Sequence, residues 1–294
     1  MNLAVLSQLQ FTVMIKLFIY LIVPILISIN VFAQIEPGAR QISLSHSDVA
    51  LSNDVFSLFN NPSGLSQIHW REVGVYYSPS PFGLSELSNG YIAYNEPFDF
   101  GSMAIGGMTY GFELYRESRF VIGYSYNYND KFFVGLAFNF HSFSIQNYGN
   151  TSALYFNFGG LAYITDQFRW GFSISNLNRA SIGEEDDQIP MIFSTGFSYN
   201  LISPISLNLS IIKDIRYKPS VRFGIEYNII RYLSLRTGFQ NEPSQYSAGI
   251  GVNYSIVKFD YALFTHQDLG LTHQVSIIIS FGRENPQTEG LRNQ

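Results

Sequence analysis

The sequence predicts an all-β protein: a transmembrane antiparallel β-barrel of about 14 strands, with a short N-terminal plug. Tight reversals divide residues 70–281 into short segments, and nearly every segment alternates apolar with small or polar residues. In residues 120–128, aromatic and apolar side chains share one face and small polar ones share the other. Apolar faces on so many consecutive strands need lipid or a second sheet to cover them. A soluble two-sheet sandwich is therefore the alternative fold.

The composition favours the barrel. Aromatic residues make up 16% of the chain and charged residues only 13%, whereas a soluble domain carries about 25% charged residues. The mean hydropathy is only +0.07, and after Phe32 no apolar run is long enough for a spanning helix. With no cysteine, disulfides and thiolate metal sites are excluded. The net charge of −5 without a basic patch argues against nucleic acid as a partner.

The N-terminus has the pattern of a secretory leader. An apolar stretch covers residues 17–32 and is followed by the small residue Ala33. This pattern predicts a signal peptide over residues 1–33, with cleavage after Ala33. A membrane anchor is the alternative, but the stretch is short for a span. Because the first basic residue is Lys16, the sequence also indicates Met14 as an alternative start of translation.

The expected strands follow from the alternation. They are 70–78, 89–95, 101–110, 119–128, 131–143, 152–163, 167–176, 190–200, 205–213, 219–228, 231–240, 245–254, 257–265 and 273–281. The even-numbered connections are short, whereas several odd-numbered ones are longer, including 145–150 and 177–189. Outer-membrane barrels have short periplasmic turns and longer outer loops, so this sorting orients the barrel. Residues 282–294 are then a polar periplasmic tail.

The two faces of the strands differ in chemistry. Val134, Phe138 and Phe140 are expected to meet lipid, while Gly135 and Asn139 face inward. The inward face also carries the charges, namely Arg169, Arg222, Glu226, Arg236, Lys258 and Asp260. A basic residue on the lipid face would cost about 2–4 kcal/mol at the midplane, which fixes the assignment of faces.

Three of these charges form a candidate lumen cluster: Arg222 and Glu226 on one strand face, and Arg236 on the next strand. One interpretation is a polar site that orients a carboxylate or another head group. The other is an ion-pair network that fills the lumen and holds the plug. We favour the network, because structural ion pairs also produce such clusters.

Residues 34–69 break the alternation and are expected to form the plug, or hatch. Short helical turns with Ser and Asp caps are expected within 45–59, followed by a turn at 60–64. Such a semi-polar segment ahead of the first strand belongs in the periplasm or inside the barrel.

The plug sequence resembles the N-terminal hatch of the FadL superfamily, whose members are fourteen-stranded outer-membrane transporters of fatty acids and aromatic hydrocarbons. The matching residues are Gly38, Ala39, Arg40, Val49, Ala50, Leu51, Asp54, Phe59 and the hatch motif Asn61, Pro62, Ser63 and Gly64 with Leu65. The Gly-Ala-Arg opening and the ending at 270–276 are more similar to the PorV/PorQ-type branch, linked to type IX secretion. In two places the chain departs from the usual pattern: residues 44–47 replace a Gly-Gly-Ala run, and Ser63 replaces Ala.

No motif indicates an enzyme. The five histidines lack metal-ligand spacing, and neither a nucleophile elbow nor a phosphate-binding loop occurs. We therefore expect no catalytic residue, no cofactor site and no metal site. The acidic run 184–187 is interpreted as a solvated loop tip; the alternatives are Ca²⁺ binding and a bridge through divalent ions to lipopolysaccharide.

Two functions remain open. The first is a docking or shuttle scaffold of the secretion or envelope-transport machinery, with other envelope proteins as partners. The second is a passive channel for hydrophobic small molecules, such as fatty acids or aromatic hydrocarbons. Brief outer loops favour the scaffold. Both place the protein in the outer membrane of a Gram-negative bacterium, in contact with lipid and lipopolysaccharide.

Overall fold

The computed structural model describes residues 36–182, 187–266 and 270–282. The expected leader, the alternative start, most of the acidic run and nearly all of the C-terminal tail lie outside these residues. Within the described ranges, no helix is long and apolar enough to cross a membrane.

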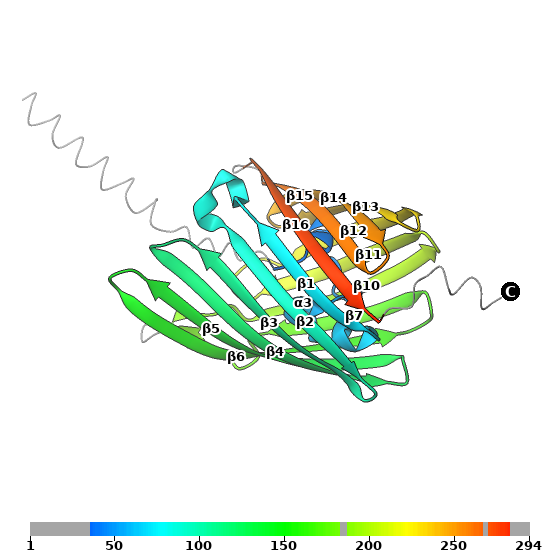
Figure 1. The fold of residues 1–294 in the computed structure, drawn as a ribbon, viewed down its shortest axis with the longest axis horizontal. Coiled ribbons are helices and arrows are strands. Elements are labelled where there is room, and N and C mark those ends of the chain that lie inside the picture. The colour runs from blue at the N-terminus through cyan, green and yellow to red at the C-terminus, as the bar shows by residue number, and fades with distance from the viewer. Residues whose placement is uncertain (1–35, 183–186, 267–269, 283–294) are drawn as a thin grey trace, which may run out of the picture. The chain divides into compact units, whose positions relative to one another are not determined.

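Fourteen antiparallel strands form a closed barrel, in which β1 pairs with β2 on one side and with β16 on the other (Figure 1). The barrel strands are β1 Arg71–Ser78, β2 Asn89–Phe98, β3 Gly101–Gly111, β4 Tyr115–Tyr128, β5 Phe132–Ile145, β6 Gly149–Tyr163, β7 Phe168–Ser175, β10 Ile192–Ile202, β11 Ile205–Asp214, β12 Ser220–Ile230, β13 Leu233–Asn241, β14 Ser244–Tyr254, β15 Val257–His266 and β16 Gly270–Phe281. The all-β fold and the number of strands predicted from the alternation are confirmed.

The connections divide less clearly into short turns and longer loops than the sequence predicted. The first outer connection holds two short 3₁₀ helices, η2 (Pro81–Gly83) and η3 (Ser85–Leu87). The one between β7 and β10 holds the small ribbon of β8 (Ser181–Ile182) and β9 (Asp187–Gln188). However, the loop expected at 145–150 is shorter in the structure, because β5 and β6 stay paired as far as Ile145, which lies opposite Gly149.

Strands β4, β5 and β6 therefore run beyond the apolar band. They have 14, 14 and 15 residues, whereas a tilted strand needs about 9–11 to cross the hydrocarbon. The outward side chains change from Phe120, Phe140 and Leu154 to polar Ser118 and Ser142 at this point. The continuous apolar outer band ends there, and the three strands extend beyond it.

Three short helical elements form the plug inside the barrel: α2 (Ala39–Ser43), α3 (Ser57–Asn60) and η1 (Pro62–Gln67). The helical stretch expected within 45–59 is mostly turns; α2 lies earlier, and neither α-helix has a side-chain cap. Asp54 still caps a turn, since its Oδ1 accepts from the Phe56 N–H at 3.0 Å.

Small wall residues make room for the plug. Most strands present an inward glycine at which an added Cβ would collide with plug atoms; they are Gly74, Gly106, Gly123, Gly135, Gly159, Gly171, Gly196, Gly224, Gly238 and Gly249. The plug side chains packed there, such as Leu44, Val55 and Leu58, have no exposed surface. Packing this close excludes water and leaves no slack for larger side chains. We call these ten glycines the glycine belt.

The glycine belt yields a test. In Gly135→Ala, the new Cβ would overlap the backbone of Pro62 and Ser63, so we expect the plug to loosen and become sensitive to protease. The matched control is Gly107→Ala, where the nearest atom to a Cβ is 3.8 Å away. Limited proteolysis of both variants in detergent provides the measurement. Equal protection of the two plugs would contradict the tight fit.

Candidate functional site

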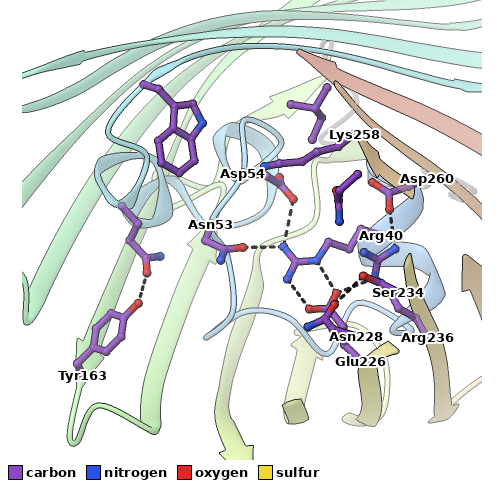
Figure 2. A pocket seen from close by; sticks show the side chains of 14 residues that line it. Arg40, Asn53, Asp54, Tyr163, Glu226, Asn228, Ser234, Arg236, Lys258 and Asp260 are labelled. Atoms are coloured by element: carbon purple, nitrogen blue, oxygen red, sulfur yellow. Dashed lines mark hydrogen bonds and ion pairs between the residues drawn. The ribbon is translucent and has the colours of Figure 1, made fainter. Parts of the chain in front are cut away.

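A charged junction joins the plug to the wall (Figure 2). Arg40 of α2 donates from Nε and Nη2 to the two carboxylate oxygens of Glu226 on β12, at 2.8 and 3.0 Å. Its Nη1 donates to Asn53 Oδ1 at 2.6 Å and lies 3.6 Å from Asp54 Oδ2. This two-pronged arrangement matches the planar guanidinium to the planar carboxylate and fixes α2 in position.

The charged junction continues along the wall through further ion pairs. Arg236 on β13 stands opposite Glu226 in the strand register and donates to its Oε2 at 2.6 Å. Its Nη1 donates to Asp260 on β15, also at 2.6 Å. The two residues are on strands separated by β14, where Gly251 leaves the space; a Cβ there would lie 2.6 Å from both groups.

The candidate lumen cluster is thus only partly assembled. Glu226 and Arg236 are together, but Arg222 has no hydrogen bond or ion pair with either of them among the described residues. It lies opposite Gln240, its Nε has no hydrogen-bond partner in the part of the chain that the structure describes, and its charge acts on Asp48 of the plug. Sequence reasoning missed Arg40, although the Gly-Ala-Arg opening contains it.

A second junction lies at the seam where the barrel closes. Glu72 of β1 is fully buried, and its Oε1 accepts from Trp70 Nε1, Ser280 Oγ and Lys258 Nζ at 2.7, 2.9 and 3.1 Å. Its Oε2 accepts from the Val55 N–H of the plug at 3.2 Å. One carboxylate therefore ties the first, last and penultimate strands to the plug.

The hatch motif is a packing device in this structure. Asn61 caps η1: its Oδ1 accepts from Ser63 Oγ at 2.7 Å, and its Nδ2 donates to the Val49 carbonyl at 2.8 Å. Pro62 is the first residue of η1, where its missing N–H costs no hydrogen bond. At Gly64, a Cβ would overlap Ser52. These contacts join η1 to the earlier part of the plug, at Val49 and Ser52.

Burial inside the plug shifts two titrations. Burial, helped by the negative charge of Asp54, raises the pKa of Asp48 to about 6. Burial also lowers the pKa of His46 to about 3, and the Arg222 charge acts in the same direction. His46 is therefore neutral at physiological pH. In the described part of the chain, no group of three or more His, Cys, Asp or Glu could hold a metal ion.

A cavity of about 290 Å³ lies against the charged junction. Its lining includes Arg40 and Asn53 from the plug and Asn253, Lys258 and Asp260 from the wall (Figure 2). Charged and amide groups of this kind bind polar ligands, whereas a carrier of hydrocarbons needs an apolar pocket.

Comparison with known proteins agrees with this architecture. The family model of the type IX secretion system membrane protein PorP/SprF matches residues 104–281. No curated protein matches the sequence.

Solved structures share the fold. The monoaromatic hydrocarbon channel CymD is 12% identical, with a TM-score of 0.65 over 83% of this chain and 97% of that chain. The toluene transporter TodX of Pseudomonas putida is 12% identical, with a TM-score of 0.61 over 83% and 96%. A FadL homologue from Pseudomonas aeruginosa is 13% identical, with a TM-score of 0.59 over 83% and 98%. At these identities, the likeness extends to the fold alone.

The first prediction for the site concerns Glu226. Glu226→Gln removes the carboxylate shared by the buried Arg236 and the half-buried Arg40, and leaves Asp260 and Asp54 as their remaining carboxylates. We therefore expect the free energy of unfolding to fall by about 3 kcal/mol. Asp214→Asn breaks the more exposed pair with Arg216 and should cost about 0–1 kcal/mol. Urea unfolding in liposomes measures both. Equal losses would contradict a structural role for the junction.

The second prediction concerns Asp48. Its pKa of about 6 in the folded protein exceeds the value of about 3.9 for an exposed aspartate. The protonated carboxyl therefore stabilises the fold below pH ~4, and this contribution is lost as the pH rises through ~6. We expect the melting temperature of Asp48→Asn to change less with pH between pH 4 and 7 than that of the parent protein. A pH profile identical to that of the parent would show that Asp48 is not buried this way.

Proposed function

Because the chain belongs to the PorP/SprF family of type IX secretion system membrane proteins, we propose that it is a docking or shuttle scaffold whose barrel stays closed. The chain is an outer-membrane barrel with a FadL-like fold. Family and fold are those of membrane barrels, not of enzymes. On this proposal, the partners are other envelope proteins of the secretion machinery.

The seated plug is the observation that carries the proposal. It is packed against the glycine belt, and charges anchor it at the Arg40–Glu226 pair and at Glu72. A further anchor joins Ser66 of η1 to Ser125 of β4, with 2.7 Å between the hydroxyl oxygens. Moving the plug would expose buried charges on both sides, which is costly. A protein that works by docking has no need to move it.

The alternative function is a passive channel for hydrophobic small molecules. It is suggested by two structural neighbours, a monoaromatic hydrocarbon channel and a toluene transporter. Against it stands the polar lining of the cavity at the junction. In addition, inward aromatic side chains already pack on other rings: Tyr76 on Tyr91 at 5.7 Å and Phe133 on Tyr163 at 5.8 Å between centroids.

The proposal includes the processing of the chain. Residues 1–33 are removed as a signal peptide, residues 34–69 act as the plug, residues 70–281 as the barrel and residues 282–294 as a periplasmic tail. The acidic run at 184–187 is then a solvated outer loop tip, and lipid and lipopolysaccharide surround the barrel.

Two measurements separate scaffold from channel. Purification after mild solubilisation should yield a stoichiometric envelope partner, and liposomes containing the protein should pass toluene no faster than empty ones. The variant lacking residues 36–60 is the positive control, because removing most of the plug opens the lumen and should raise the flux. Toluene flux through the intact protein, with no partner recovered, would overturn the scaffold in favour of the channel.

A further inference from the structure

The cavity beside the charged junction lies near one end of the barrel. Four of its wall residues lie near the ends or starts of strands: Asn228, Ser234, Asn253 and Lys258. These strand ends meet at the short turns 231–232 and 255–256, on the same side as the start of β1 and the end of β16. In an outer-membrane barrel that side faces the periplasm.

Among the charged groups that line the cavity, two cations are more exposed than the carboxylates. Side chains of Arg40 and Lys258 retain 18% and 21% exposure, whereas the carboxylates of Asp54, Glu226 and Asp260 retain 3%, 8% and 5%. The carboxylates are covered by their own partners, so the accessible surface presents the positive ends of these pairs.

Lys258 has donors to spare. An ammonium has three N–H groups, and among the described residues Lys258 gives one hydrogen bond, to Glu72 at 3.1 Å. Asn253 stands directly opposite Lys258 in the register of β14 and β15. An amide side chain offers a donor and an acceptor, as an extended peptide backbone requires. Trp70 completes this wall, with its ring 6.0 Å from the ammonium.

The charge balance limits what can bind. Three cations, Arg40, Arg236 and Lys258, face four carboxylates, those of Asp54, Glu226, Asp260 and Glu72, so the formal charge of this set is −1. A polyanion such as a phosphate-rich lipid head group is therefore disfavoured, while a single carboxylate can pair with Lys258. The volume, at the lower end of the roughly 300–1,000 Å³ common for ligand pockets, suits a short segment.

We propose that this periplasmic cavity binds an acidic side chain on a short extended segment of a periplasmic partner protein. Its carboxylate pairs with the Lys258 ammonium, the adjoining backbone bonds to the Asn253 amide, and Trp70 covers the segment from one side. The inference rests on the proposed scaffold function and names the chemistry by which a partner would be recognised.

Fluorescence provides the test, because the chain has only two tryptophans. In Trp170→Phe, which alters a lipid-facing side chain, Trp70 becomes the reporter of the cavity. The probes are acetyl-Gly-Glu-Gly-amide and its glutamine counterpart, titrated into the full-length protein in detergent. We expect the glutamate peptide to bind about tenfold more tightly, as fits a charge-assisted hydrogen bond.

Matched variants locate the binding. Lys258→Gln should weaken the glutamate peptide about tenfold, whereas Lys218→Gln on the outer loop 215–219 should leave its affinity unchanged. Asn253→Phe, which fills the cavity but keeps the Lys258–Glu72 pair, should abolish binding and covers the case in which Lys258→Gln does not fold.

Three results would overturn the proposal. They are equal affinity for the two peptides, unchanged affinity in Asn253→Phe, and tighter binding of an uncharged N-acetylglucosamine disaccharide, which would indicate a glycan instead. None of them bears on the scaffold function, whose failure would be seen as toluene flux without a partner.

Discussion

The closed ladder of hydrogen bonds is the constraint on which this structure depends. Lipid cannot hydrogen-bond to a strand edge, so a sheet in the membrane must pair its last strand with its first. Here β16 pairs with β1 through seven residues, from Arg71–Phe281 to Tyr77–Val275. Once the wall is closed, its outer face within the lipid band must be mainly apolar, and charged strand residues such as Arg169, Glu226 and Arg236 turn inward, into a lumen that holds the plug.

Plug and wall are therefore built for each other. The glycine belt gives α2, α3 and η1 close access to the strand backbones, and the charges that lipid excludes find partners across the same boundary. Arg40 joins Glu226 on one side of the lumen, while Glu72 joins the Val55 amide at the closing seam. Because each of these carboxylates also binds wall residues, closure of the barrel and seating of the plug support one another.

Sequence periodicity predicted the wall well, because lipid and lumen impose a strict alternation on each strand. It predicted the Arg236–Glu226 contact for the same reason: neighbouring strands bring inward side chains together. Arg222 does not join Glu226 in that cluster because of the rise along a strand. Four residues span about 13 Å, which is beyond the reach of an ion pair. Arg40 was missed because no repeat governs the path of the plug.

The central claim is that the protein works with its plug in place. Since the chain lacks cysteine, Ser66→Cys with Ser125→Cys, and separately Ser45→Cys with Ser247→Cys, would tie plug to wall where the native hydroxyls already touch. The most direct measurement is secretion by cells carrying each locked protein, before and after reduction. The account predicts full secretion with the disulfides intact. Secretion that stops when the plug is locked and returns on reduction would contradict it.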